Sequence, residues 1–205
     1  MTQDGPSDWF EPLYANAQRN SGQIPWALMG TTPYLEDWLK QQPSTSGQSA
    51  AVVACGLGDD AEALAAAGYQ VTAFDISETA IRWAQERFPN SPVDYVVADL
   101  FELPTSWTQT FDVVFEFRTI QALPLGVRAE VMERIADLVA PQGVLLVATY
   151  MRGSEAEPEG PPWPLSATEL AYFETLGLKA MQHERFKNKD SRFAERVRVE
   201  YRWAD

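Results

Sequence analysis

The sequence predicts an α/β protein built on a mostly parallel sheet, and three observations support this fold class. Apolar segments of strand length alternate with amphipathic segments of helix length from about residue 50 onward, which is typical of strand–helix–strand units. Residues 144–148 are apolar throughout, as expected of a strand covered on both faces. Residues 195–203 alternate apolar and charged side chains after a polar turn, which predicts a C-terminal antiparallel hairpin with one solvent-facing side.

Local signals delimit the individual elements. Gly68 lies where a glycine commonly ends a helix, and Ser77 can cap the next helix, which Pro89 prevents from continuing. Ser166 and Glu169 have the spacing of a capping box that opens the last helix. We expect the Pro-Gln-Gly sequence at 141–143 to turn the chain into the fifth strand. The expected strands are 52–54, 70–74, 93–98, 111–115, 144–148, 179–186 and 195–203, and the expected helices are 60–67, 78–88, 126–139 and one from 167.

The length of 205 residues fits a single domain over 1–205. Residues 1–45 form an aromatic-rich N-terminal cap in this interpretation, and a polar link at 44–49 leads into the first strand. Residues 50–205 then form the core of the domain.

The composition argues against several classes of function. A net charge of −13 disfavours nucleic acid as a partner, because such a surface repels phosphate backbones. No apolar run approaches the ~20 residues of a membrane span, and no signal peptide is visible. The single cysteine, Cys55, and the single histidine, His183, cannot build a usual metal site, and a lone cysteine fits a reducing cytoplasm. We therefore expect a cytoplasmic protein without metal, membrane or nucleic-acid partners; the sequence predicts no oligomeric state.

A glycine-rich turn followed by an acid is the strongest functional signal. Gly56 and Gly58 follow an apolar strand, and Asp75 ends the next one. The interval is roughly twenty residues, at which an acid reaches the ribose of a nucleotide held on the turn. Glycines at these places would also let a ligand approach the backbone. The turn alone leaves three alternatives open: a nicotinamide cofactor, S-adenosylmethionine or no cofactor.

Features outside the turn favour S-adenosylmethionine. Asp99 follows the third strand, where it could hydrogen-bond an adenine amine with Leu100 and Phe101 beside the ring. The turn at 141–143 and the terminal antiparallel hairpin are not expected of a nicotinamide domain.

From Ala51 to Tyr150 the chain resembles the class I S-adenosylmethionine-dependent methyltransferases. Within that group it is similar to the thiopurine/thiol and halide methyltransferase family, including its tellurite-resistance-like members. The motifs concerned are the glycine turn, residues 74–77, 98–101, 111–116, 121–124 and 141–143, and the spacing of Trp9, Tyr14, Pro25-Trp26 and Pro33. The resemblance implies a Rossmann-like sandwich with a mostly parallel seven-stranded sheet, a C-terminal antiparallel hairpin and an N-terminal helical cap that folds over the cofactor.

The resemblance also implies which residues bind the cofactor. The glycines would lie against its methionine part, Asp75 would bind the ribose and Asp99 the adenine. The Asp-Arg pair that family members often have after the fourth strand is Glu116-Phe117 here, and Arg118 comes one place later. The family's Pro-Trp-Asp is Pro-Trp-Ala in this chain. The expected cofactor-binding residues are Trp26, Ala54, Gly56, Gly58, Asp75, Ile76, Asp99, Leu100, Phe101, Glu116 and Phe117.

The candidates for catalysis are Glu116 and Arg118, and the resemblance implies that Glu116 and Phe117 border the site of methyl transfer. Trp9 and Tyr14 could offer aromatic faces to a cation. Trp163 lies in a Pro/Gly-rich loop after the fifth strand, at the sheet edge where ligands bind in open α/β folds. The expected substrate pocket therefore consists of Trp9, Tyr14, Arg118 and Trp163.

These features predict a methyltransferase that acts on a small molecule, with a thiol or another soft nucleophile as acceptor. Methyl transfer from a sulfonium is an in-line displacement with a good leaving group, so positioning and exclusion of water can carry the catalysis. A thiol is partly ionised at neutral pH and needs no strong base. Halide, metalloid, amine and carboxylate acceptors stay open. The alternative functions are an NAD(P)-dependent oxidoreductase and a non-catalytic S-adenosylmethionine-binding protein.

Overall fold

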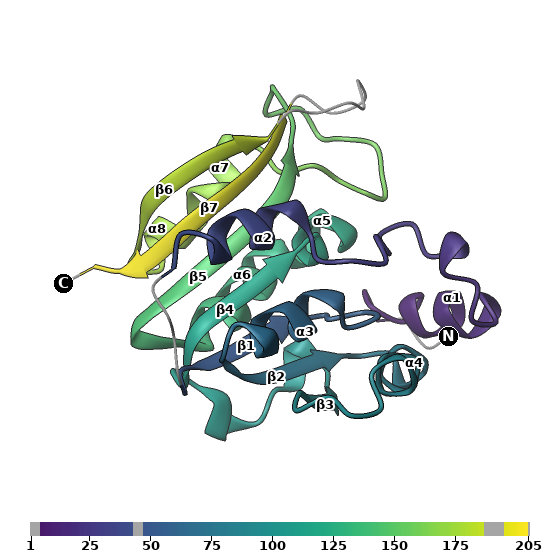
Figure 1. Ribbon diagram of the computed structural model, residues 1–205. Coiled ribbons are helices and arrows are strands. Elements are labelled where there is room, and N and C mark those ends of the chain that lie inside the picture. Colours follow the sequence, from purple (N-terminus) through teal and green to yellow (C-terminus); the bar gives the residue numbers. More distant parts are fainter. Residues whose placement is uncertain (1–4, 43–46, 187–194, 205) are drawn as a thin grey trace. The chain divides into compact units, whose positions relative to one another are not determined.

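The computed structural model describes residues 5–42, 47–186 and 195–204. The chain divides into two compact units, residues 1–103 and 104–205 (Figure 1). Residues 44–46 of the polar link predicted at 44–49, and most of the polar turn before the last strand, lie outside the described residues. The single domain with a cap over 1–45 and a core over 50–205 stays a prediction.

The first unit contains three parallel strands in the order β3-β2-β1. Their register pairs Val53 with Phe74 and Asp75 with Val97, so the carboxyl ends of the three strands lie at one edge. Two helices connect the strands. The elements are β1 (Ser49–Val53), α3 (Asp59–Ala66), β2 (Gln70–Asp75), α4 (Glu78–Arg87), β3 (Asp94–Val97) and the 3-10 turn η2 (Leu100–Glu102).

The N-terminal segment of this unit is helical, as predicted, and packs against the rest of the unit. It comprises α1 (Phe10–Asn16), the 3-10 turn η1 (Ser21–Gln23) and α2 (Pro33–Leu39). Thr32 caps α2. The first residue of this helix is Pro33, and proline is favoured there because the backbone N–H at this position has no partner within the helix. Tyr14 and Ile24 from this segment are buried in one apolar cluster with Leu57 and Trp83, which anchors the segment on α4 and the glycine turn.

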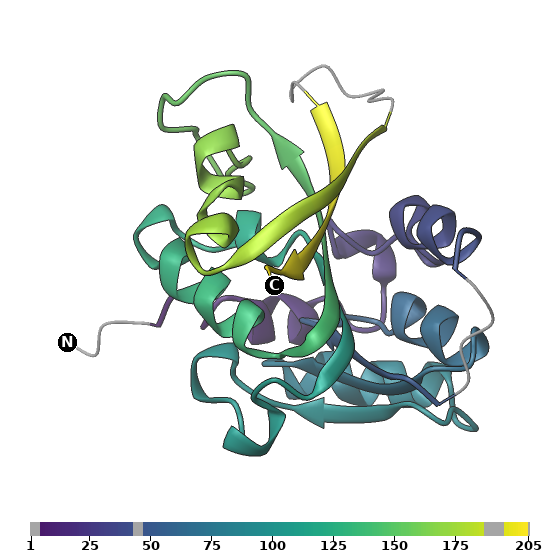
Figure 2. The same cartoon turned by 90° about the vertical axis from the view of Figure 1, so that its left-hand side faces the viewer.

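The second unit contains four strands in the order β4-β5-β7-β6. β4 and β5 are parallel, whereas β7 runs antiparallel to both β5 and β6. Two short helices, α7 and α8, lie beside the β6–β7 hairpin (Figure 2), where Phe173 packs against Tyr201 with ring centroids 5.1 Å apart. The elements are β4 (Phe111–Phe117), α5 (Thr119–Ala122), α6 (Arg128–Asp137), β5 (Val139–Met151), α7 (Ala167–Leu170), α8 (Tyr172–Thr175), β6 (Leu178–Phe186) and β7 (Glu195–Trp203), with 3-10 turns η3 (Thr105–Trp107) and η4 (Leu125–Val127).

The predicted fold class is confirmed: a mostly parallel seven-stranded sheet with a C-terminal antiparallel pair and surrounding helices. The capping box of Ser166 and Glu169 is formed in both directions. Gly68 adopts a left-handed φ of 100° just past the first core helix, the conformation in which a glycine ends a helix.

Two local predictions were wrong. Residues 141–143 were expected to form a turn but lie within β5, which runs from Val139 to Met151. The pairing of β5 with β4 shifts register here. The backbone of Gly143 lies close to that of Phe111 in β4. A Cβ on Gly143 would lie 2.8 Å from the carbonyl oxygen of Phe111, so only glycine fits there. The supposed solvent-facing side of the last strand is also largely covered, since Arg198 is 1% and Glu200 8% exposed.

Candidate active site

Asp75, at the end of β2, lies against the glycine turn and is buried, with 4% of its surface exposed. Its Oδ2 accepts a hydrogen bond from the backbone N–H of Gly56 at 2.9 Å, and its Oδ1 accepts one from the N–H of Ser77 at 2.9 Å. Burial raises the pKa of Asp75 to about 6, although these backbone hydrogen bonds act in the opposite direction. A carboxylate offers about four acceptor positions, so this one retains capacity for the two hydroxyls of a ribose.

The two glycines of the turn are required by conformation and by two tyrosines. Gly56 and Gly58 have φ values of +53° and +89°, in the left-handed region that favours glycine. A Cβ on Gly56 would lie 2.9 Å from the hydroxyl of Tyr14, and one on Gly58 would collide with the hydroxyl of Tyr95. The sequence analysis explained the two glycines by the approach of a ligand to the backbone. In the structure, the hydroxyls of Tyr14 and Tyr95 also occupy the space that a Cβ would need.

An aromatic group from the N-terminal segment lies over the turn. The indole N–H of Trp26 donates to the hydroxyl of Tyr14 at 2.7 Å, and the two rings meet edge to face at 5.9 Å. Trp9 stacks on Phe10 at 4.1 Å and meets Trp26 at 5.8 Å. Trp26 and Trp9 are partly exposed while Tyr14 is buried. Tyr14, predicted for the substrate pocket, is therefore a neighbour of the glycine turn.

Sequence reasoning missed Glu11, which connects the N-terminal segment to Asp75 through Ser77. Its carboxylate accepts hydrogen bonds from the Ser77 hydroxyl at 2.5 Å and from the Thr79 N–H and hydroxyl at 3.0 Å and 2.5 Å. Ser77 in turn holds Asp75 through its backbone N–H. These hydrogen bonds lower the pKa of Glu11 against the opposing effect of burial. No local pattern could reveal this contact, because it joins residues 66 positions apart.

The predicted adenine-binding residues lie at the end of β3. The Asp99 carboxylate accepts the backbone N–H of Phe101 at 2.9 Å and so caps the turn η2. Leu100 is buried, and Phe101 is partly exposed. Ile76, just past Asp75, is also partly exposed. Ala54 is exposed and has a left-handed φ of 48°, which belongs to the tight turn after β1.

In the second unit, Glu116 lies near the end of β4 and is completely buried. Its Oε1 accepts the backbone N–H groups of Thr119 and Ile120 at 2.5 Å and 3.1 Å, which orders the start of α5. Its Oε2 has no hydrogen-bond partner among the described residues. Burial raises the pKa of Glu116 to about 7, against the effect of these hydrogen bonds.

Arg118 follows β4 in a left-handed conformation, with φ of 67°. Its guanidinium lies 4.5 Å from the ring centroid of Phe117 and 4.7 Å from that of Tyr150, and it donates to the Tyr150 hydroxyl at 2.8 Å. Phe117 and Arg118, predicted from neighbouring sequence positions, thus come together with a residue of β5 that sequence reasoning did not single out.

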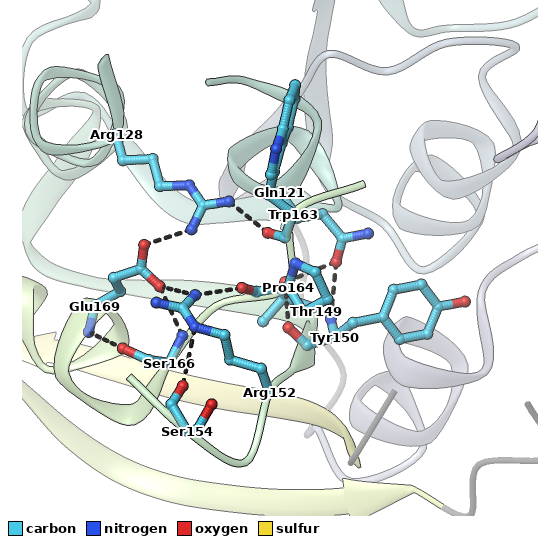
Figure 3. Close-up of polar contacts among 10 residues, drawn as sticks. All are labelled: Gln121, Arg128, Thr149, Tyr150, Arg152, Ser154, Trp163, Pro164, Ser166 and Glu169. Atoms are coloured by element: carbon cyan, nitrogen blue, oxygen red, sulfur yellow. Dashed lines mark hydrogen bonds and ion pairs between the residues drawn. The ribbon is translucent and has the colours of Figure 1, made fainter. Parts of the chain in front are cut away.

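Trp163 is fixed through its backbone rather than through its ring (Figure 3). Its N–H donates to the carbonyl of Gln121 at 2.7 Å, and its carbonyl accepts from the guanidinium of Arg128. The side chain of Gln121 accepts from the hydroxyl of Thr149 and the N–H of Tyr150, both at 2.8 Å. The loop that carries Trp163 is therefore tied to α5 and to the end of β5.

A charged cluster secures the other end of this loop. Glu169 forms ion pairs with both Arg128 and Arg152 (Figure 3). Arg152 also donates to the carbonyls of Ser154 and Pro164, at 3.0 Å and 2.5 Å. Arg128 is 3% exposed, so the cluster holds buried charge in paired form.

Each unit brings together some of the residues that the sequence singled out. The first gathers the glycine turn, Asp75, Tyr14 and Trp26, and the second gathers Glu116 with Phe117 and Arg118. Across the ranges that the structure describes, no group of His, Cys, Asp and Glu could hold a metal ion, and no helix has the length and apolarity of a membrane span.

Comparison with known proteins identifies the family. The family model described as Thiopurine S-methyltransferase matches residues 16–201. A probable thiol methyltransferase 2 of Arabidopsis thaliana is 30% identical over 151 residues, which cover 73% of this chain and 66% of that protein, just under two thirds. A thiopurine S-methyltransferase of Vibrio atlanticus is 26% identical over 184 residues, which cover 82% of this chain and 80% of that protein.

Two solved structures show the same fold at low sequence identity. The N-methyltransferase NodS from Bradyrhizobium japonicum, in complex with S-adenosylhomocysteine, has a TM-score of 0.73 at 16% identity and covers 98% of this chain and 100% of its own. Magnesium protoporphyrin IX methyltransferase from Synechocystis, with bound S-adenosylmethionine, has a TM-score of 0.74 at 15% identity and covers both chains completely.

The fold is that of a class I methyltransferase. The chain belongs to the thiopurine S-methyltransferase family. It is an S-adenosyl-L-methionine-dependent methyltransferase for small molecules, and the nicotinamide alternative finds no support.

Proposed function

We propose that the methyl acceptor of this enzyme is a small thiol or another soft nucleophile. Relatives named thiol, thiopurine and thiocyanate methyltransferases support this class. The chemistry of the site supports it as well, since a thiol of pKa near 8.5 needs only correct placement and a dry environment.

The arrangement around Asp75 carries the proposal for cofactor binding. We infer that Asp75 binds the ribose, because its buried carboxylate lies on the glycine turn with acceptor capacity to spare. Asp99 with Leu100 and Phe101 would bind the adenine. Trp26, with Tyr14 beneath it, would cover the methionine part. The remaining proposed contacts are Ala54, Gly56, Gly58, Ile76, Glu116 and Phe117.

The bound cofactor would supply a methyl group on a positively charged sulfur. The acceptor's lone pair forms the new bond to the methyl carbon while the carbon–sulfur bond of the cofactor breaks and leaves its electron pair on that sulfur. We assign Arg118 to the acceptor, together with Trp9 and Trp163 as walls of the pocket. Glu116 acts by holding the turn after β4 through the N–H groups of α5.

Asp75→Ala tests the cofactor site. Loss of a charge-assisted hydrogen bond costs ~1.5–3 kcal/mol, which lowers the affinity for S-adenosylhomocysteine roughly ten- to a hundredfold in calorimetry. Asp94→Ala is the matched control, because Asp94 is an exposed acid at the start of the neighbouring strand. Unchanged affinity in Asp75→Ala would show that the ribose lies elsewhere. Turnover of a thiol panel tests the acceptor class.

We also infer a cytoplasmic protein that acts without nucleic-acid or membrane partners. The net charge of −13 and the lone Cys55 support this proposal. Retention of the purified protein on a polyanion column at physiological salt would contradict the expected lack of nucleic-acid affinity.

A further inference from the structure

We propose that Glu11 is a positioning residue of the cofactor site, which acts through Ser77 to orient the carboxylate of Asp75 toward the ribose. The inference rests on the proposed function, because it takes Asp75 as the ribose ligand. All three residues belong to the first unit: Glu11 is in α1, Asp75 ends β2, and Ser77 is the N-cap of α4. Glu11 is not among the residues proposed to contact the cofactor itself.

Ser77 connects the two acids through different groups. Its backbone N–H donates to Oδ1 of Asp75 at 2.9 Å, and its hydroxyl donates to Oε2 of Glu11 at 2.5 Å. The same hydroxyl accepts the N–H of Ala80 at 3.0 Å. A hydroxyl has a single proton to donate, so Glu11 receives the one that Ser77 has. Ser77 is completely buried and held from both sides, which also fixes the direction of its N–H toward Asp75.

The surroundings of Glu11 match an ionised carboxylate. Besides the Ser77 hydroxyl, Oε2 accepts the backbone N–H of Thr79 at 3.0 Å, and Oε1 accepts the Thr79 hydroxyl at 2.5 Å. All of these partners act as donors, and an ionised carboxylate only accepts. Burial raises the pKa of Glu11, but these hydrogen bonds outweigh burial and bring the pKa below its ordinary value. Glu11 is therefore charged at neutral pH, and its hold on Ser77 is a charge-assisted hydrogen bond.

One side of α1 contacts both groups that support Asp75. Glu11 and Tyr14 are three residues apart, so they are neighbours on the helix surface. Glu11 binds Ser77, whose N–H holds Oδ1 of Asp75. The N–H of Gly56 holds Oδ2 of the same carboxylate at 2.9 Å. The Tyr14 hydroxyl lies directly beside Gly56, since a Cβ there would be 2.9 Å from it. The helix therefore keeps in place both backbone groups that orient the acid.

A purely structural role is the competing explanation for Glu11. Its hydrogen bonds fasten α1 to α4, although Tyr14 of α1 and Trp83 of α4 are already buried in one apolar cluster. Burial and, to a smaller extent, the charge of Glu11 raise the pKa of Asp75, so the second acid has a cost that a structural contact alone would not require. The two explanations differ in what they predict. A structural role affects binding of the whole cofactor, whereas a positioning role affects only the ribose hydroxyls.

The test uses two ligands that differ only in the ribose hydroxyls, S-adenosylhomocysteine and its 2′,3′-dideoxy analogue. Calorimetry gives the affinity for both ligands in the wild type, Glu11→Gln, Asp75→Ala and the variant that combines these two substitutions. Glu11→Gln keeps the size of the side chain, removes its charge and replaces one acceptor oxygen by a donor. Glu36→Gln is the matched control, because Glu36 is an exposed acid of α2 in the same N-terminal segment.

We expect the wild type to bind S-adenosylhomocysteine more tightly than the analogue. Glu11→Gln should weaken binding of S-adenosylhomocysteine about tenfold and leave binding of the analogue nearly unchanged, because the lost contact is that of Asp75 with the ribose. In the Asp75→Ala background the same substitution should have little further effect, since residues that act through one another are not additive. Glu36→Gln should change neither affinity.

Equal losses for the two ligands in Glu11→Gln would assign Glu11 a structural role and overturn the proposal. A further tenfold loss on top of Asp75→Ala would show that Glu11 acts independently of that acid and would overturn it as well. Equal affinity of the wild type for both ligands, or unchanged affinity for S-adenosylhomocysteine in Asp75→Ala, would contradict the ribose assignment in the proposed function, and the role of Glu11 with it.

Discussion

Glu116→Gln should make the stability of this protein less dependent on pH. Glu116 is completely buried, and burial raises its pKa from an ordinary 4.5 to about 7. Below pH 4.5 the carboxyl is protonated in both the folded and the unfolded chain, so it has no effect. Between pH 4.5 and 7 the unfolded chain gives up its proton first, and this favours unfolding.

The size of the effect follows from the difference between the two pKa values. Each pKa unit corresponds to 1.36 kcal/mol, so Glu116 costs the folded state about 3 kcal/mol by pH 8. Glutamine cannot ionise, and its carbonyl can still accept the N–H groups of Thr119 and Ile120. Because a small part of this cost is already present at pH 5, the variant should gain about 2.5 kcal/mol relative to the wild type between pH 5 and pH 8.

Urea denaturation of both proteins at pH 5, 6, 7 and 8 measures this difference. The contribution of Asp75, whose pKa is also raised by burial, is common to both and cancels. Glu130→Gln, at an exposed position on α6, serves as the control for the loss of a charge. If the stability difference between Glu116→Gln and the wild type stays constant over this range, Glu116 ionises normally in the folded protein and the reasoning fails.

Three further outcomes follow from the first unit. Gly56→Ala should lower the melting temperature and cost about 1–2 kcal/mol, because alanine is strained at φ +53° and its Cβ would lie 2.9 Å from the Tyr14 hydroxyl; an unshifted thermal melt would contradict this. Glu11→Gln should weaken S-adenosylhomocysteine binding in calorimetry about tenfold, because it removes charge-assisted hydrogen bonds that hold the N-terminal segment, while the exposed Glu36→Gln should leave binding unchanged. The affinity for S-adenosylhomocysteine should rise between pH 5 and 7 as Asp75, with a pKa of about 6, becomes a carboxylate; a flat profile would exclude it as the ribose ligand.

Local sequence signals predicted most of the fold, because helix caps and strand periodicity depend on residues that are neighbours along the chain. Ser77 caps α4 at the expected place, since its hydroxyl accepts the N–H of Ala80, and the helix ends before Pro89. The strand over 195–203 was predicted with the bounds that β7 has, because its period of two is a property of consecutive residues.

Predictions failed where a distant backbone or side chain decides the outcome. Residues 141–143 have the composition of a turn, but the carbonyl of Phe111 approaches Gly143 and the segment continues as strand. The charged side chains of β7 suggested a surface exposed to water, yet Arg198 and Glu200 are buried. Neither contact can be inferred from neighbours along the chain.

The candidate site likewise has features that the local sequence predicts and features that depend on distant segments. The glycine spacing and the acid at the end of β2 predict a position for the cofactor site, because a strand–turn–helix unit brings the glycines and the acid together within one stretch of sequence. The properties of that acid depend on other segments: Glu11 fixes Ser77, Ser77 holds Asp75, and burial raises the pKa of Asp75 to about 6. A motif of this kind therefore predicts where a ligand would bind, whereas the surroundings of its acid depend on distant contacts such as that of Glu11, which the motif does not contain.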